Sequence, residues 1–137
     1  MFNKITAEIV AELRSIAGAE NVLYGPENAE ALAPYAHDEV VGLAAEPEVV
    51  VRVRSVQQVA EIFRLAQRER VPVTPRGAGF GLSGGAVPVH GGIVLSLERM
   101  NRILEIDRAN LMAVVEPGVI TGAVSYTHLT LPTILRV

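Results

Sequence analysis

The sequence contains no cysteine in its 137 residues. This absence excludes disulfides, thiolate nucleophiles and metal sites with cysteine ligands. Tryptophan is also absent, and aromatic residues make up only 4% of the chain. No apolar run reaches the ~20 residues that a membrane-spanning helix needs, and the first residues, Met1–Ile5, lack the apolar core of a signal peptide. We therefore expect a cytoplasmic protein without a membrane span.

An excess of charge of one sign is lacking as well. The chain has 12 basic and 15 acidic residues, for a net charge of -3, and no run of Lys or Arg forms a basic stripe. Nucleic acid and anionic membrane surfaces are therefore not expected as partners. The three histidines, His37, His90 and His128, belong to no metal-ligand or Ser/His/Asp pattern. We expect no metal and assign no catalytic residue.

The residues that are present have the composition of a globular domain, with 50% hydrophobic and 20% charged residues. Thr6 as an N-cap and Gly18 as a stop predict a helix over Thr6–Ala17. A capping box at Ser55 and Gln58 begins a second amphipathic helix. β-Branched and apolar runs predict strands. The remaining predicted elements are a short helix at Glu27–Ala33, strands at Val49–Val53, Val71–Thr74 and Ile93–Leu97, and a hairpin of Ile103–Asp107 and Met112–Glu116.

The order strand, helix, strand forms a βαβ unit. Val49–Val53 and Val71–Thr74 are therefore expected to be parallel, because a helical crossover joins parallel strands. The expected fold class is α+β, in which a small parallel βαβ (α/β) sheet carries flanking helices and an added β-hairpin. We find no internal repeat and no low-complexity segment.

Seven glycines are concentrated between residues 77 and 92. The stretch from Gly79 to Gly84 matches the G-x-G-x-x-G pattern of dinucleotide-binding folds. That pattern requires a helix to begin at once, because the pyrophosphate lies on the helix N-terminus. Here Pro88 and a glycine pair come before the next strand, and no Lys follows the glycines as in a Walker loop. Neither helix-end phosphate site is therefore expected.

A third interpretation is a loop between two strands whose own backbone N–H groups form an anion cradle, which glycine permits at low steric cost. A flexible linker fits less well, because linkers are polar whereas Phe80, Leu82 and Val87 interleave apolar side chains that favour burial. We expect Pro75–Gly85 to be an ordered loop with several glycines at positive φ and no helix beginning at Gly84.

The stretch TPRGAGFGLSGGAVPVHGGIVLSLERMNRILEID, followed by AVVEPGV, resembles the FAD-binding domain of the vanillyl-alcohol oxidase and para-cresol methylhydroxylase (PCMH-type) superfamily. The resemblance covers roughly Ile9–Gly122 and is nearest to the glycolate oxidase flavin subunit and D-lactate dehydrogenases. It implies that the glycine loop holds the FAD pyrophosphate and that the later Pro-Gly lies near the flavin. The cofactor-binding residues that it implies are Arg76, Gly77, Ala78, Gly79, Phe80, Gly81, Leu82, Ser83, Gly84, Pro117 and Gly118.

The sequence departs from the relatives at several points. Phe80 stands where they commonly carry Thr, which removes one hydroxyl hydrogen bond to the cofactor. Because Pro75–Val89 contains no His, Cys or Tyr that could link covalently to the flavin, we expect non-covalent FAD. Arg76 could pair with the diphosphate or form an ion pair that fixes the loop. Tyr35 and Asp38 match a Tyr-x-x-Asp of the relatives, and we expect them in a surface loop.

The decapeptide VSYTHLTLPT, Val124–Thr133, interrupts the helix that Thr121 is placed to cap. It resembles, codon by codon, the in-frame translation of a transposase library adapter, and the alternative is a genuine last strand. Non-native segments are left out of fold reasoning. We therefore expect residues 1–123 to be the N-terminal part of a PCMH-type FAD-binding domain, truncated by a non-native tail of residues 124–137.

The resemblance implies a parent enzyme that oxidises a small 2-hydroxy acid of the glycolate or D-lactate type by hydride transfer to flavin. The implied partners are that substrate and further oxidase subunits or an electron acceptor. The catalytic base and the groups that bind the substrate carboxylate are not expected in this chain, so the fragment itself is expected to be inactive. The alternative is a non-catalytic nucleotide-binding module, in which the same loop holds an ADP-like ligand.

Overall fold

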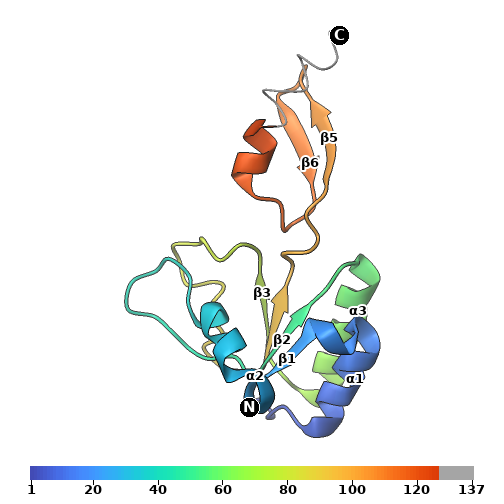
Figure 1. Cartoon of the computed structure of the whole chain (residues 1–137), viewed down its shortest axis with the longest axis vertical. Coiled ribbons are helices and arrows are strands. Elements are labelled where there is room, and N and C mark those ends of the chain that lie inside the picture. The colour runs from blue at the N-terminus through green and yellow to red at the C-terminus, as the bar shows by residue number, and fades with distance from the viewer. Residues whose placement is uncertain (127–137) are drawn as a thin grey trace.

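The computed structural model describes residues 1–126 of the chain (Figure 1). It contains a four-stranded sheet and a separate two-stranded sheet. Residues 121–126 form a last helical segment, so the helix that was expected to be interrupted at Val124 continues through Tyr126. The rest of the expected non-native tail, from position 127 onward, lies outside the described residues. The elements in chain order are α1 (Ala7–Ala17), η1 (Ala19–Asn21), β1 (Val22–Tyr24), α2 (Gly25–Leu32), η2 (Ala33–Ala36), β2 (Val49–Arg52), α3 (Val56–Glu69), β3 (Val73–Arg76), β4 (Ile93–Ser96), β5 (Ile103–Asp107) and β6 (Met112–Val115).

Both long helices begin where the local sequence predicts. The Thr6 hydroxyl accepts a hydrogen bond of 3.3 Å from the Ile9 N–H at the start of α1, and Gly18 follows this helix with a φ of 94°. At the start of α3, the Ser55 hydroxyl accepts a bond of 3.2 Å from the Gln58 N–H. These caps satisfy N–H groups that have no partner inside the helix. These two expected helices are confirmed, and the short helix expected at Glu27–Ala33 is present as α2, over Gly25–Leu32.

The four-stranded sheet has the order β1-β2-β4-β3. β2 and β3 run in the same direction, as expected for a βαβ unit, but both pair with β4, which lies between them. β1 pairs antiparallel with β2, so the sheet is mixed and not purely parallel. The sequence pattern predicts no strand at β1, because three residues are too few to show a period.

The position of β3 corrects the expected strand at Val71–Thr74. The Val71 N–H donates to the Ala66 carbonyl oxygen at 2.9 Å and so belongs to the end of α3. Pairing with β4 then runs from Val73 to Arg76. β3 contains Pro75, which has no N–H to donate, and it is tolerated because β3 is an edge strand.

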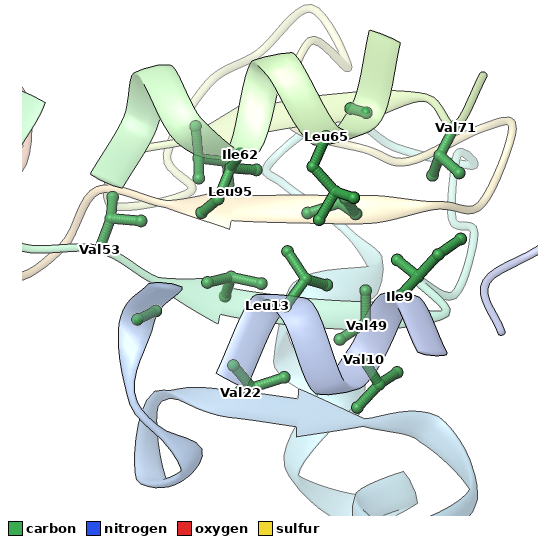
Figure 2. Close-up of a cluster of buried hydrophobic side chains, with 14 of the residues drawn as sticks. Ile9, Val10, Leu13, Val22, Val49, Val53, Ile62, Leu65, Val71 and Leu95 are labelled. Atoms are coloured by element: carbon green, nitrogen blue, oxygen red, sulfur yellow. The ribbon is translucent and has the colours of Figure 1, made fainter. Parts of the chain in front are cut away.

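The main hydrophobic core lies between the sheet and the two long helices. Figure 2 shows the apolar stripes of α1 and α3 packed against the same face of β2 and β4. Leu13, Ile62 and Leu95 in this core are at most 1% exposed, and burial of each such side chain contributes about 1.5–3 kcal/mol. The other face of the sheet carries a smaller cluster of Leu32, Val50 and Val94. This smaller cluster positions α2 and the segment after it.

The hairpin of β5 and β6 extends away from the four-stranded sheet (Figure 1). Its turn covers residues 108–111, with Leu111 at a φ of 56°, so the expected hairpin is confirmed. Every residue of β6 is exposed. Among residues 1–126, no helix is long and apolar enough to cross a membrane.

Candidate cofactor site

The glycine loop joins the amino end of β4 to the carboxyl end of β3, so its first residues lie at the carboxyl edge of the parallel strands. Ligands of parallel sheets bind at this edge. Residues 77–92 form turns and bends, and no helix begins at Gly84, as the sequence predicts. Within Pro75–Gly85, Gly79 has a φ of 80° and Gly84 a φ of 77°. Gly91 and Gly92, farther along the same loop, have φ values of 70° and 71°.

Gly79 and Gly84 are required by the fold itself. A Cβ added at Gly79 would overlap the guanidinium of Arg76, and one added at Gly84 would lie 2.6 Å from Cδ2 of Leu43. Both positions also have the left-handed φ that side chains disfavour. These two glycines therefore allow the loop to pack against its own protein neighbours.

Gly81 and Gly85 have a different environment. A Cβ at Gly81 would have only ordinary contact with Asp38, at 3.6 Å from Oδ2, and one at Gly85 would meet nothing within 4 Å. Neither residue has a positive φ. The fold thus has no need for glycine at these positions, and their missing side chains leave free space beside the loop backbone. A diphosphate held by main-chain N–H groups needs such space.

Pro117 and Gly118 come close to the start of the loop. A Cβ at Gly77 would lie 3.3 Å from the Pro117 carbonyl oxygen. The Gly118 N–H donates to the Met100 carbonyl oxygen at 2.7 Å, and a side chain there would overlap the carbonyl oxygen of Leu97. Close packing on the turn before β5 is therefore a sufficient reason for glycine at position 118.

Three adjoining hollows, of about 390, 360 and 460 Å³, share Ala78. The first is lined in part by the charged side chains Arg52, Arg76 and Glu98. The largest is lined by loop residues 77–81 and by residues 119–121. Of the expected cofactor-binding residues, those that line the three hollows are Arg76, Gly77, Ala78, Gly79, Phe80, Gly81 and Gly118, whereas Leu82, Ser83, Gly84 and Pro117 lie outside them.

The expected burial of the apolar loop side chains holds only in part. Val87 is 3% exposed, but Phe80 is 68% and Leu82 is 76% exposed. No helix or strand among residues 1–126 covers Phe80 and Leu82, so these two side chains are exposed to solvent. Phe80 remains next to the loop glycines and contributes to two of the hollows.

Arg76 forms no ion pair within residues 1–126. Its Nη1 donates to the carbonyl oxygen of His37 at 2.7 Å, and its Nη2 donates to that of Pro34 at 3.1 Å. The guanidinium also lies over the Tyr35 ring, with Cζ at 5.5 Å from the ring centroid. Of the two roles considered for Arg76, the ion pair is therefore absent among these residues, and two hydrogen bonds to backbone oxygens and a cation–π contact stand in its place.

The segment after α2 contains Tyr35 and Asp38, which were expected in a surface loop. For Asp38 this expectation is wrong, because its side chain is buried. Asp38 is 6% exposed, and its Oδ2 has no hydrogen-bond partner among the described residues. The Tyr35 hydroxyl donates to Oε1 of Glu98 at 2.8 Å. Burial, and to a smaller extent the Glu98 carboxylate, raise the pKa of Tyr35 above that of an ordinary tyrosine. The Tyr-x-x-Asp spacing was the sequence pattern that could have placed this segment beside the glycine loop.

Within residues 1–126, no group of three metal-ligating side chains is present.

Comparisons with known proteins agree with this geometry. The model of the FAD binding domain family matches residues 47–128. Among curated proteins, an FAD-linked oxidoreductase of Mycobacterium tuberculosis (strain ATCC 25618 / H37Rv) is 43% identical over 114 residues, which are 82% of this chain and 24% of that protein. The glycolate oxidase subunit GlcD of Bacillus subtilis (strain 168) is 39% identical over 85% of this chain and 24% of its own length. The D-lactate dehydrogenase of Anaerostipes hadrus is 39% identical over 87% of this chain and 24% of its own length.

Solved structures show the same fold. p-Cresol methylhydroxylase with bound substrate superposes with a TM-score of 0.77 and 28% identity, over 95% of this chain and 26% of that chain. Alkyldihydroxyacetonephosphate synthase superposes with a TM-score of 0.75 over 91% of this chain and 24% of that chain, at 20% identity, which supports the fold alone. The chain therefore spans about a quarter of the length of the relatives that it matches. On its glycine loop, its sheet and these matches, the chain belongs to the FAD binding domain family.

Proposed function

We propose that this chain is the diphosphate-binding part of an FAD-dependent enzyme that oxidises a small 2-hydroxy acid of the glycolate or D-lactate type. The substrate class rests on the glycolate oxidase subunit and the D-lactate dehydrogenase, each 39% identical to the chain. The chain covers 24% of each. The substrate, further oxidase subunits and the electron acceptor are accordingly proposed for the parent protein.

The observation that carries the cofactor assignment is the free space at Gly81 and Gly85, where the fold does not demand glycine. The loop backbone there can approach a ligand without a side chain in between. Bound FAD supplies the acceptor for a hydride from the substrate carbon. The loop residues of this chain bind and orient the diphosphate. Residues 75–89 of the loop contain no His, Cys or Tyr, which favours non-covalent binding.

The proposed domain boundary follows the sequence. Residues 1–123 are the native N-terminal part of the FAD-binding domain, and residues 124–137 are the non-native tail. The catalytic base and the groups that bind the substrate carboxylate belong to the rest of the parent protein. The chain by itself is then inactive toward glycolate and D-lactate.

The test uses the parent protein under anaerobic conditions. D-Lactate and glycolate should each bleach the visible flavin absorbance, while L-lactate serves as the enantiomeric control for the first. Bound flavin that no 2-hydroxy acid reduces would contradict the proposed substrate class. Equal affinity for ADP and FAD without flavin reduction would instead identify a non-catalytic nucleotide-binding module.

A second arm tests the loop. Gly81→Val should abolish flavin binding by the parent protein, because the added methyl groups fill the space beside the loop. Gly122→Val is the control, since a Cβ at Gly122 meets nothing within 4 Å and lies outside the glycine loop. Normal flavin content in the Gly81 variant would exclude the loop as the cradle.

A further inference from the structure

The guanidinium of Arg76 is the most heavily engaged group at the start of the loop. Both of its terminal nitrogens donate to backbone oxygens, Nη1 to His37 and Nη2 to Pro34. The Tyr35 ring lies beside it, and the backbone of Gly79 packs against it so closely that no Cβ would fit. A guanidinium held in this way presents a fixed fork to neutral oxygens. One N–H of each terminal nitrogen is thus already bonded to a backbone oxygen.

The segment that Arg76 holds also supports the loop farther along. The Glu39 N–H donates to the Gly81 carbonyl oxygen at 3.0 Å. The carboxylate of Asp38 lies next to Gly81, and the side chain of Leu43 lies against Gly84. The loop thus rests on residues 38–43 at two glycines, Gly81 and Gly84, and Arg76 is the link between residues 34–37 and the end of β3.

We propose that Arg76 is a positioning residue. It fixes residues 34–38 against the glycine loop and so sets the shape of the cradle before the diphosphate binds; it is not itself a phosphate ligand. The inference rests on the proposed function only in taking the loop as the cradle of the diphosphate. Pre-organisation of this kind increases affinity by lowering the ordering cost of binding. Substitution of Arg76 by Lys distinguishes the positioning role from direct phosphate binding. A lysine keeps the charge that attracts phosphate, but it cannot donate to two carbonyl oxygens in the fixed geometry of the fork.

The first measurement needs no ligand. Hydrogen exchange of the 137-residue chain should show the Glu39 amide exchanging about tenfold faster in both Arg76→Lys and Arg76→Gln, because hydrogen bonds from a charged group are lost. Amides in α1 should exchange at the wild-type rate, which separates a local effect from global destabilisation. Arg108→Lys, on the exposed turn of the hairpin, is the control for the substitution itself. Unchanged exchange at Glu39 in both Arg76 variants would overturn the proposal.

The second measurement is ADP affinity at low and high salt. A positioning role predicts that Arg76→Lys and Arg76→Gln weaken ADP binding by a similar factor of about ten, and that the Lys variant keeps the wild-type salt dependence. Ethylguanidinium should restore affinity to Arg76→Ala, and ethylammonium, with the same charge, should not. Wild-type affinity in the Lys variant combined with loss in the Gln variant would make Arg76 a direct phosphate ligand. If the chain binds no ADP, the exchange result still decides the role of Arg76, and only the proposed function is affected.

Discussion

At the scale of single residues, the loop glycines have two kinds of role. Gly79 and Gly84 have positive φ and pack against Arg76 and Leu43, so they serve the fold. Gly81 has no positive φ, and a Cβ there would make only an ordinary contact, so this glycine is free to serve a ligand. A glycine-rich motif therefore does not have to be explained by ligand contact at every position.

Gly79→Ala and Gly81→Ala should separate stability from binding. Gly79→Ala should lower the free energy of unfolding by about 1–2 kcal/mol, because it places a side chain at positive φ and displaces Arg76. Gly81→Ala should change it by less than about 0.5 kcal/mol and still weaken FAD binding in the parent protein. Urea denaturation and flavin absorbance measure the two effects. Equal destabilisation by both substitutions would contradict this division.

Gly118→Ala should act on the fold before it acts on the cofactor. The new Cβ would overlap the Leu97 carbonyl oxygen and lie 2.9 Å from that of Met100, and neither backbone group can turn aside as a flexible side chain would. We expect a loss of about 2–3 kcal/mol, within the range for local backbone strain, in thermal or urea unfolding. Gly122→Ala is the control, because its Cβ would meet no neighbour within 4 Å. Wild-type stability in the Gly118 variant would show that the turn around residue 100 adapts easily.

At the scale of elements, the hairpin depends mostly on its own contacts. Two strands alone are marginally stable in water, and all of β6 is exposed. Arg102 pairs with Glu116 at 2.7 Å, and Asp107 accepts bonds from Asn110. The hydrogen bonds of Asn110 lower the pKa of Asp107, and those of Arg102 lower the pKa of Glu116. Both ends of the hairpin thus contain a carboxylate that favours its charged form.

Acid should therefore loosen the hairpin before it loosens the main sheet. A carboxyl group with a lowered folded-state pKa contributes stability that is present above its unfolded pKa and is lost as the pH falls through the folded value. We expect the Asn110 amide to lose protection first as the pH drops into the acidic range where aspartate titrates. NMR of the amides during an acid titration measures this, and Asp107→Asn should remove most of the pH dependence at Asn110. A simultaneous loss of protection in β4 would indicate global unfolding instead.

At the scale of the whole molecule, a core lies between the four-stranded sheet and two helices, but the hollows beside the glycine loop are open to solvent. These hollows lie at the carboxyl edge of the sheet, and Phe80 and Leu82 beside them are exposed. Exposed apolar groups of this kind favour association. Binding energy that depends on two walls is largely lost when only one is present.

The purified 137-residue chain should therefore be colourless, of low solubility and inactive toward glycolate and D-lactate. Calorimetric titration should give an FAD dissociation constant weaker than micromolar, because the loop supplies the diphosphate contacts alone. Sedimentation at several concentrations should show association. Micromolar or tighter binding by a soluble monomer would show that this chain is a self-sufficient cofactor domain.

The sequence by itself determined the structural features that depend on residues close together in the chain. Thr6 and Ser55 cap their helices through bonds to residues three positions away, and such local contacts can be read from the chain. The strand-to-strand nature of the loop was also readable, because Pro88 and the glycine pair after it prevent a helix. The resemblance to FAD-binding domains followed from the same stretch.

Only the tertiary structure decided the features that join distant segments. β1 is a strand because it pairs with β2, and β4 lies between β2 and β3 although it follows both in the chain. Arg76 binds backbone oxygens that lie 39 and 42 residues away in the sequence. Asp38 is buried because residues 38 and 39 pack against Gly81 of the glycine loop. No local pattern encodes such contacts, since their free energy depends on packing that exists only after the sheet and its helices have assembled.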